Sequence, residues 1–406
     1  MNTSSIPERI RAFNADRDAA LVAGKYAAMR ESVFRFYRGT SHLFNEDIPA
    51  DSSIWQAPPT WNVGDLHIEN FGSFKGDNRV AYFDLNDFDE CILAPNLADL
   101  ARLSCSLFVA ADFLKQNEAE SRQLVKTLTD AYATTLAAGY IRPLEQETAT
   151  GIVGQFLRSV TERKRRFFVE SHVKRSKHKV RFRAISGRIN KANKATKQRI
   201  RQLIHTWAQT QPTPDFFNVL DVAHRVAGTG SLGVDRFTIL VSGTGKPGKE
   251  YVLDLKRSGP STLQARLAAQ QPPWLSHAER IVEVQKRVQA ASPALLHPLT
   301  MSDGTSYVLR ELQPIEDKIA LTDLAGRPKK LTQLVGTMGQ LCAWGHLRSG
   351  GRQGSSIADA LIAFGGDQHT WQPALHDYAY QYAGQVRTDY ETYCHAYDAG
   401  YYRGGA

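Results

Sequence analysis

Two short stretches in the first quarter of the chain decide how the rest is interpreted. The first reads Gly64-Asp65-Leu66-His67-Ile68-Glu69-Asn70, and the second reads Phe83-Asp84-Leu85-Asn86-Asp87. A carboxylate can orient or deprotonate a hydroxyl group, and carboxylate and amide oxygens are the ligands that a hard cation such as Mg²⁺ prefers. The pattern therefore predicts a site that combines proton transfer with a metal ion.

Each of these polar residues also has an ordinary interpretation. Asp and Asn frequently cap turns, so any one of them taken alone could be structural. A calcium loop over 84–89 is a further alternative, but it lacks the glycine and the glutamate that such a loop needs. Turn capping explains the full arrangement less well than it explains any single member.

A glycine-rich stretch in the second half reads Gly228-Thr229-Gly230-Ser231-Leu232-Gly233. Because residues 236–242 are β-branched and aromatic, a strand and not a helix is predicted to follow it. A glycine loop between strands lets bare backbone approach phosphate groups. A second predicted strand, 251–256, ends at Lys256, within reach of the same phosphates. The ordinary alternatives are a hairpin turn and a solvated lysine.

An acidic partner for Lys256 is expected on the helix predicted over 276–291. Glu279 and Glu283 lie four residues apart, on one face of that helix. We favour Glu283, although either side chain could simply face solvent.

Length and composition limit the class of protein. The 406 residues, 42% of them hydrophobic, suffice for two lobes with a sizeable core. No stretch approaches the length of a signal peptide's apolar region or of a spanning helix. The four cysteines are widely spaced and form no metal-binding pair, which predicts a reducing compartment, the cytoplasm.

The positive charge is concentrated in one segment, 163–201. It holds 16 Lys and Arg against one acidic residue, a net +15, so the remainder of the chain carries −6. Such a segment can bind nucleic acid, anionic lipid or another anionic partner through charge neutralisation. Alternatively, it is a solvated helical face.

The order of predicted elements indicates an α+β fold. Helices are predicted over 7–38, from Leu97, over 117–140 and 150–207, over 331–348 and through the last 50 residues. Strands are predicted at 80–83, at 236–242 and 251–256 with a turn at 243–248 between them, and as a pair within 297–312. We divide the chain into a helical lobe (1–215), a small nucleotide-binding lobe (216–320) and returning helices (321–406).

These motifs together resemble the aminoglycoside phosphotransferase and choline kinase branch of the protein-kinase-like superfamily. The resemblance covers 63–70, 83–87 and the stretch Pro95-Asn96-Leu97-Ala98-Asp99-Leu100-Ala101. The chain resembles still more closely the bacterial family called domain of unknown function 2252, over about residues 38–349. Two features depart from an ordinary kinase: Val63 stands where the phosphotransferases have histidine, and Asp65 comes 191 residues before Lys256 instead of after it.

The resemblance implies a two-lobed, circularly permuted kinase-like fold. It further implies an ATP- and Mg²⁺-dependent phosphotransferase acting on a hydroxyl acceptor, either a small molecule or a protein. The implied roles are catalysis by Asp65 and Asn70, metal binding by Asn70, Asp84 and Asp87, and nucleotide binding by Gly228, Gly230, Ser231, Gly233, Lys256 and Glu283. Alternatives are a kinase-like nucleotidyltransferase, a pseudokinase, and a non-enzymatic protein that binds anions or nucleic acid.

Overall fold

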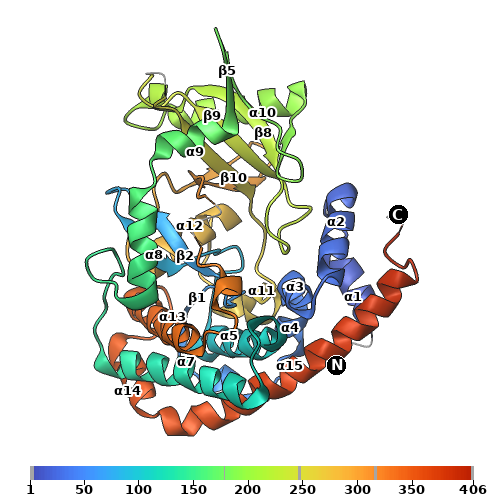
Figure 1. Ribbon diagram of the computed structural model, residues 1–406, viewed down its shortest axis with the longest axis vertical. Coiled ribbons are helices and arrows are strands. Elements are labelled where there is room, and N and C mark those ends of the chain that lie inside the picture. The colour runs from blue at the N-terminus through green and yellow to red at the C-terminus, as the bar shows by residue number, and fades with distance from the viewer. Residues whose placement is uncertain (1–3, 178, 246–247, 315–317, 404–406) are drawn as a thin grey trace.

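The computed structural model describes residues 4–177, 179–245, 248–314 and 318–403. They form two parts, a small antiparallel sheet with its covering helices and a larger helical body (Figure 1). The expected α+β class and the antiparallel sheet are therefore confirmed. None of the helices described here is long and apolar enough to cross a membrane.

The small part is built on one sheet of six strands in the order β11-β12-β10-β9-β8-β7. Every neighbouring pair is antiparallel. One face of the sheet is apolar and packs on α10 (Lys194–Ala208). The strands are β7 (Ile189–Lys191), β8 (Val219–Arg225), β9 (Arg236–Val241), β10 (Tyr251–Arg257), β11 (His297–Thr300) and β12 (Ser306–Glu311).

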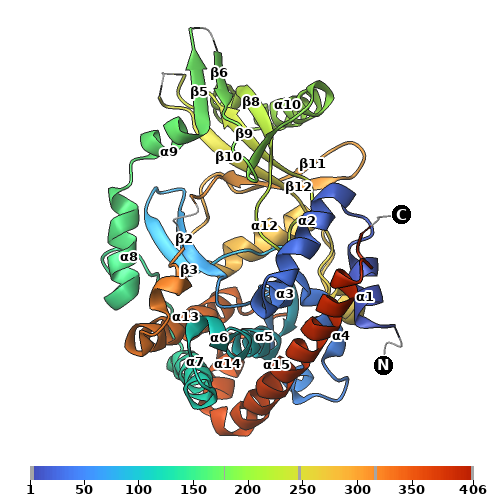
Figure 2. The same ribbon diagram turned by 45° about the vertical axis from the view of Figure 1, so that its right-hand side comes forward.

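Helix α12 (His277–Val288) joins the two parts. It packs on β11 and β12 of the small part and on α13 (Pro328–Ser349) of the helical body, so its apolar residues belong to the large core. Turning the molecule shows α12 between the sheet and the helices below (Figure 2). The two parts therefore meet along a helix and not only through the connecting chain.

The helical body centres on α5 (Asn96–Val109), in which every residue is buried. Two short strand pairs, β1–β4 and β2–β3, flank the loops quoted above. The pair β2–β3 lies between α5 and the small part (Figure 2). Their bounds are β1 (Pro59–Asn62), β2 (Phe71–Lys75), β3 (Ala81–Leu85) and β4 (Ile92–Pro95). Further helices of the body are α6 (Ala111–Leu114), α7 (Glu118–Ala138), α14 (Ala358–Gly366) and α15 (Gln368–Asp398).

Most of the predicted helices and strands are confirmed, and the segment 7–38 is helical in three pieces. These are α1 (Ile6–Phe13), α2 (Ala19–Arg30) and α3 (Val33–Gly39), and α4 (Ser41–Asp47) follows. Asp18 and Ser32 cap the second and third helices by accepting backbone amide protons, which is why new helices begin there. The predicted turn 243–248 includes two residues outside the described ranges.

The continuous helix predicted over 150–207 is wrong. The structure has α8 (Gly151–Glu162) and α9 (Arg165–His172), then the hairpin β5 (Val173–Ser176) and β6 (Lys179–Phe182), and β7 before α10. Val180 and Phe182 alternate with charged residues and pack on the sheet, which is a strand pattern that a count of charges does not reveal. The hairpin projects from the top of the molecule (Figure 1).

Candidate active site

The loop 63–70 is shaped by the first turn of α5. The carboxylate of Asp99 accepts the amide protons of Val63 and Gly64, at 2.6 and 2.8 Å. Gly64 has a φ of +89°, and a Cβ there would collide with the carbonyl of Glu90. Glycine is therefore required beside Asp65, and the carboxylate of Asp99 determines where the loop begins.

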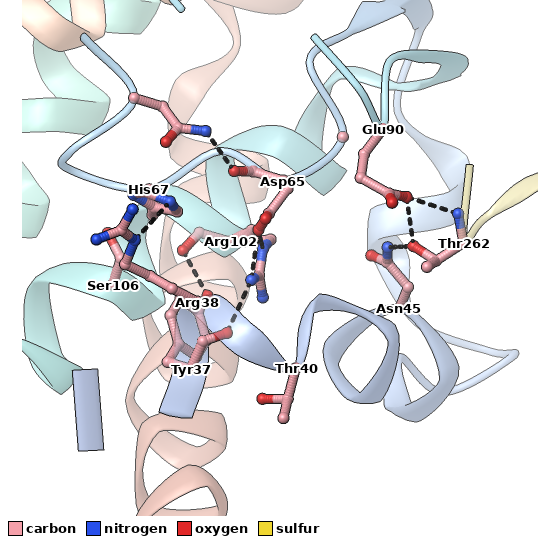
Figure 3. A network of polar contacts seen from close by, with 12 residues as sticks. Tyr37, Arg38, Thr40, Asn45, Asp65, His67, Glu90, Arg102, Ser106 and Thr262 are labelled. Carbon is pink, nitrogen blue, oxygen red and sulfur yellow. Dashed lines mark hydrogen bonds and ion pairs between the residues drawn. The ribbon is translucent and has the colours of Figure 1, made fainter. Parts of the chain in front are cut away.

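Asp65 is held by a buried arginine of α5 (Figure 3). Arg102 Nε donates to Asp65 Oδ1 at 2.6 Å, and the guanidinium group lies 4.2 Å from the centre of the Tyr37 ring. Burial raises the pKa of Asp65 to about 6, although the charge of Arg102 opposes the rise. The side chain keeps 21% of its surface exposed, so one part of the carboxylate is held while another remains accessible.

Asn70 connects the two loops. Its side-chain amide donates to the backbone carbonyl of Asp65 at 2.8 Å, which closes the loop on itself. Its own carbonyl accepts the amide proton of Asn86 at 2.7 Å. The predicted catalytic residues and the second acidic stretch are thus brought together.

Asp84 was predicted at the end of a short strand, and the structure places it one residue before the end of β3 (Ala81–Leu85). Both of its oxygens are used: Oδ1 accepts the amide proton of Leu85 at 2.8 Å, and Oδ2 accepts that of Ala290 at 2.9 Å and a proton of Arg348 at 3.2 Å. Burial raises the pKa of Asp84, with Arg348 opposing the rise. In this arrangement Asp84 joins β3, α13 and the end of α12.

Asp87 and Asp89 face the small part. Asp87 has a φ of +70° and lies 3.7 Å from Lys256 Nζ, and Asp89 forms a shorter ion pair with the same lysine. Although burial opposes the shift, the charges of Lys256 and Arg310 lower the pKa of Asp87. The side chains of Asp87 and Asp89 are 50% and 37% exposed. These carboxylates, and not Asp84, are the open ones.

The glycine loop lies between β8 and β9, as predicted, and the N-terminal helices support it. Arg17 donates to the carbonyls of Gly230 and Leu232 at 2.6 and 3.1 Å. Gly233 has a φ of +89°, and a Cβ there would lie 2.8 Å from Arg17 and Val22. Gly228 also has a positive φ, and Ser231 accompanies it in the turn. Two glycine positions are thus explained by backbone shape and by this close approach.

The expected pairing of Lys256 with a helical glutamate is wrong. Glu283 lies 3.5 Å from Lys286 on the outer side of α12, and Glu279 accepts the amide proton of Leu275 at the start of that helix. The inner side of α12 instead presents Arg280. The loop carboxylates of the helical body take the place that Glu283 was expected to fill.

Arg280 was missed by the sequence analysis, as were the roles of Asp99 and Arg102. Arg280 donates to the carbonyls of Asp89 and Gly259 at 3.0 and 2.8 Å, and also to Cys91. It therefore fixes the acidic loop against the small part. For Asp99 and Arg102 a signal existed, because they are the two charged residues of α5 and lie three apart, a spacing that puts both on one face of the helix.

The comparison with protein families found a match. The model of one family matches residues 17–396, nearly the whole chain, and that family is described as "Uncharacterized protein conserved in bacteria (DUF2252)". The chain belongs to this family. Comparisons with curated proteins and with solved structures found no match.

The residues of this family member suit a hard cation at one place. Among the described residues, no three His, Cys, Asp or Glu side chains gather closely enough to hold a metal by themselves. Asp87 and Asp89 nevertheless offer two accessible carboxylates beside Lys256, and the backbone carbonyl of Asn70 accepts the amide proton of Asn86, the residue before Asp87. Mg²⁺ is commonly held by one or two carboxylates together with phosphate oxygens and water, so this donor set fits it.

Proposed function

We propose that the protein is an ATP- and Mg²⁺-dependent phosphotransferase that acts on a hydroxyl acceptor. The observation that carries the proposal is that the motifs around Asp65 and Lys256, 191 residues apart in the sequence, are linked through the acidic loop. Asn70 holds the backbone carbonyl of Asp65 and also binds Asn86. Asp87, the next residue, lies 3.7 Å from Lys256. The acidic loop 86–90 therefore connects the loop of Asp65 with Lys256. Phosphoryl transfer needs these groups on one substrate pair, an acceptor at the base and a phosphate chain at the lysine and metal.

The order of elements in the small part supports the same proposal. The glycine loop is followed by the lysine strand β10, by α12, and by β12, which leads into residues 312–314. This is the order expected of a kinase-like small lobe, although here it comes after the catalytic loop in the chain. The helix α13 returns to the body, where Arg348 reaches Asp84 and His346 lies 3.9 Å from Asp99. A circular permutation accounts both for the changed order of the elements in the chain and for the return of α13 to the helical body.

In the proposed reaction Asp65 takes the proton of the acceptor hydroxyl. A carboxylate with a pKa near 6 is mostly ionised at neutral pH and is a stronger base than an ordinary aspartate. Arg102 fixes its orientation, and Lys256 holds the phosphate chain. Bound at Asp87, Asp89 and Asn70, Mg²⁺ would supply charge neutralisation of the phosphates. Asp84 then acts as a positioning residue.

The test compares transfer of label from γ-labelled and α-labelled ATP to hydroxyl compounds and to protein acceptors. The proposal expects transfer from the γ position alone, and a loss of about 10²–10⁴-fold in Asp65→Asn. Asp16→Asn, at an exposed position before α2, is the matched control and should keep full activity. Transfer from the α position would indicate a nucleotidyltransferase, and full activity in Asp65→Asn would overturn the assignment of the base.

A further inference from the structure

The two faces of the six-stranded sheet differ in chemistry. One face is apolar and covered by α10. On the other face Asp254 lies two residues before Lys256, so both point to the same side. Their cross-strand neighbours are Arg310 opposite Asp254 and Arg236 opposite Lys256. The end of this face that carries Lys256 is therefore charged, while Leu240 and Val252 at its other end are apolar and are covered by α9 and the β5–β6 hairpin.

Three arginines converge on Asp254, which is 2% exposed. Arg236 binds both carboxylate oxygens at 2.8 and 2.6 Å, Arg225 binds one at 2.8 Å, and Arg310 lies at 3.5 Å. Three guanidinium groups thus share one carboxylate. The cluster holds two positive charges more than its own acid neutralises, at side chains that are 10–20% exposed.

The surplus charge faces the acidic loop. Arg236 and Arg310 both act on Asp87, together with Lys256. Burial lowers the pKa of Arg225 to about 10, and the neighbouring positive charge of Arg236 adds to the shift. Buried charge without a counterion is costly. An anion bound here would relieve that cost, and a cation on Asp87 and Asp89 would increase the need for one.

The charged end of this face offers little apolar surface that would hold a nucleobase. Ligand rings are usually held between apolar walls. Here Val308, the apolar neighbour opposite Lys256, is already packed into the core of the helical body, and Thr238 and Asp254 occupy the centre of the face. Four cationic side chains lie on neighbouring strands of this face, and these strands span about 14 Å at the usual strand spacing. They are Arg225 on β8, Arg236 on β9, Lys256 on β10 and Arg310 on β12. The row suits an elongated anion.

We propose that this charged face recognises the phosphate donor by its linear polyphosphate chain and not by its base. Arg225, Arg236 and Arg310 would extend the site that Lys256 begins, because guanidinium groups bind phosphates in pairs of hydrogen bonds. Nucleoside triphosphates and inorganic polyphosphate both carry such a phosphate chain. The inference rests on the proposed function in one respect, since it takes this cleft as the donor site.

The test measures binding by titration calorimetry in the presence of Mg²⁺, with ATP, inorganic tripolyphosphate and adenosine as ligands. Tripolyphosphate should bind within about tenfold of ATP, and adenosine should neither bind nor compete. Comparison of ATP with tripolyphosphate as donors in the transfer assay then distinguishes the two sources of the chain.

Arg310→Gln provides the variant, because Arg225 and Arg236 remain on Asp254 when Arg310 is lost. Tripolyphosphate affinity should fall about tenfold, the usual effect of one charged hydrogen bond. Arg257→Gln is the matched control: it removes an exposed arginine from β10, on the opposite side of the strand from Lys256, and should change nothing. Thermal melting checks that both variants fold.

The outcomes separate this inference from the proposed function. Binding of adenosine without tripolyphosphate would overturn the inference, as would equal affinities in Arg310→Gln and Arg257→Gln. Tripolyphosphate binding without any transfer would overturn the proposed function and leave the donor-site chemistry in place. If Arg310→Gln fails to fold, the competition between the three ligands in the native protein still decides whether the phosphate chain or the base is recognised.

Discussion

The loops 63–70 and 86–90 both bring carboxylates to the site, and they are held in opposite ways. The first is fixed from within the helical body, by Asp99 on its backbone and Arg102 on Asp65. The second reaches across to the small part, where Lys256 and Arg280 hold it. One loop is a permanent part of the core, and the other is held by ion pairs that a metal and a phosphate chain could replace.

The difference teaches that position in a motif does not decide the role of a residue. Asp84 lies in the second stretch, yet it is buried and fully hydrogen-bonded like the first loop. Asp87 lies three residues away, with half of its side chain exposed. The same residue type is structural in one environment and available for a ligand in the other.

The largest expected effect comes from replacing each of these two aspartates by alanine. Asp84→Ala leaves Arg348 buried without its partner, so the free energy of unfolding should fall by about 3 kcal/mol. Asp87→Ala should change that free energy by less than about 1 kcal/mol, because its ion pair is exposed, and should instead weaken Mg²⁺-dependent ATP binding. Urea denaturation and calorimetry measure both effects. A larger loss of stability in Asp87→Ala would contradict the comparison.

The support of the first loop can be tested separately from its chemistry. Asp99→Asn keeps the shape of the side chain but leaves one oxygen to accept two amide protons, so the position of Asp65 should relax. We expect turnover to fall about 10–100-fold, with affinity for tripolyphosphate unchanged, because a misplaced base costs only the transfer step. Steady-state kinetics separate kcat from KM. A fall in tripolyphosphate affinity equal to that in turnover would show that the two loops are not independent.

The two loops should also respond to pH with opposite signs. The pKa of Asp65 is raised from 3.8 to about 6, so its ionisation costs stability as the pH rises from about 4 to about 6. The pKa of Asp87 is lowered, so its contribution to stability is present above about pH 4 and is lost as the pH falls below it. Unfolding free energies of the native protein, Asp65→Asn and Asp87→Asn across pH 3–7 give the two slopes. Turnover should fall about tenfold per pH unit below pH 6.

The smallest expected effect concerns the exposed basic hairpin, which contrasts with the buried arginine cluster. We propose that the hairpin binds an anionic partner, because its residues Lys174 and Lys179 are exposed, and Phe167 of the preceding helix α9 is 71% exposed. Each Lys→Gln change should weaken binding of a DNA oligonucleotide about threefold and reduce the salt slope by about 1, without changing turnover. Lys329→Gln, on the helical body, is the control. Binding that does not depend on salt would remove the proposal.

Local patterns predicted much of the fold. The apolar stripe of Leu97, Leu100, Leu103 and Leu107 predicted α5, and the β-branched runs around 236–242 and 251–256 predicted β9 and β10. The prediction for the basic segment was wrong because its charged residues obscured the alternation at Val180 and Phe182. That alternation becomes decisive only when a sheet lies beside the segment. The short strands β1, β2 and β4 were missed, because four or five residues give too little periodicity.

For the candidate site, the residue types and their spacing singled out Asp65, Asn70, the acidic stretch, the glycine loop and Lys256. These follow from the sequence because each depends on local backbone shape and on side-chain chemistry. The partners of these residues could not be predicted in the same way. Lys256 pairs with Asp87 and Asp89 and not with Glu283, Asp84 is enclosed, and three arginines share Asp254. All of these contacts join segments that are distant in the sequence. Such contacts are determined by how the sheet, α12 and α5 pack, and packing is a property of the whole chain.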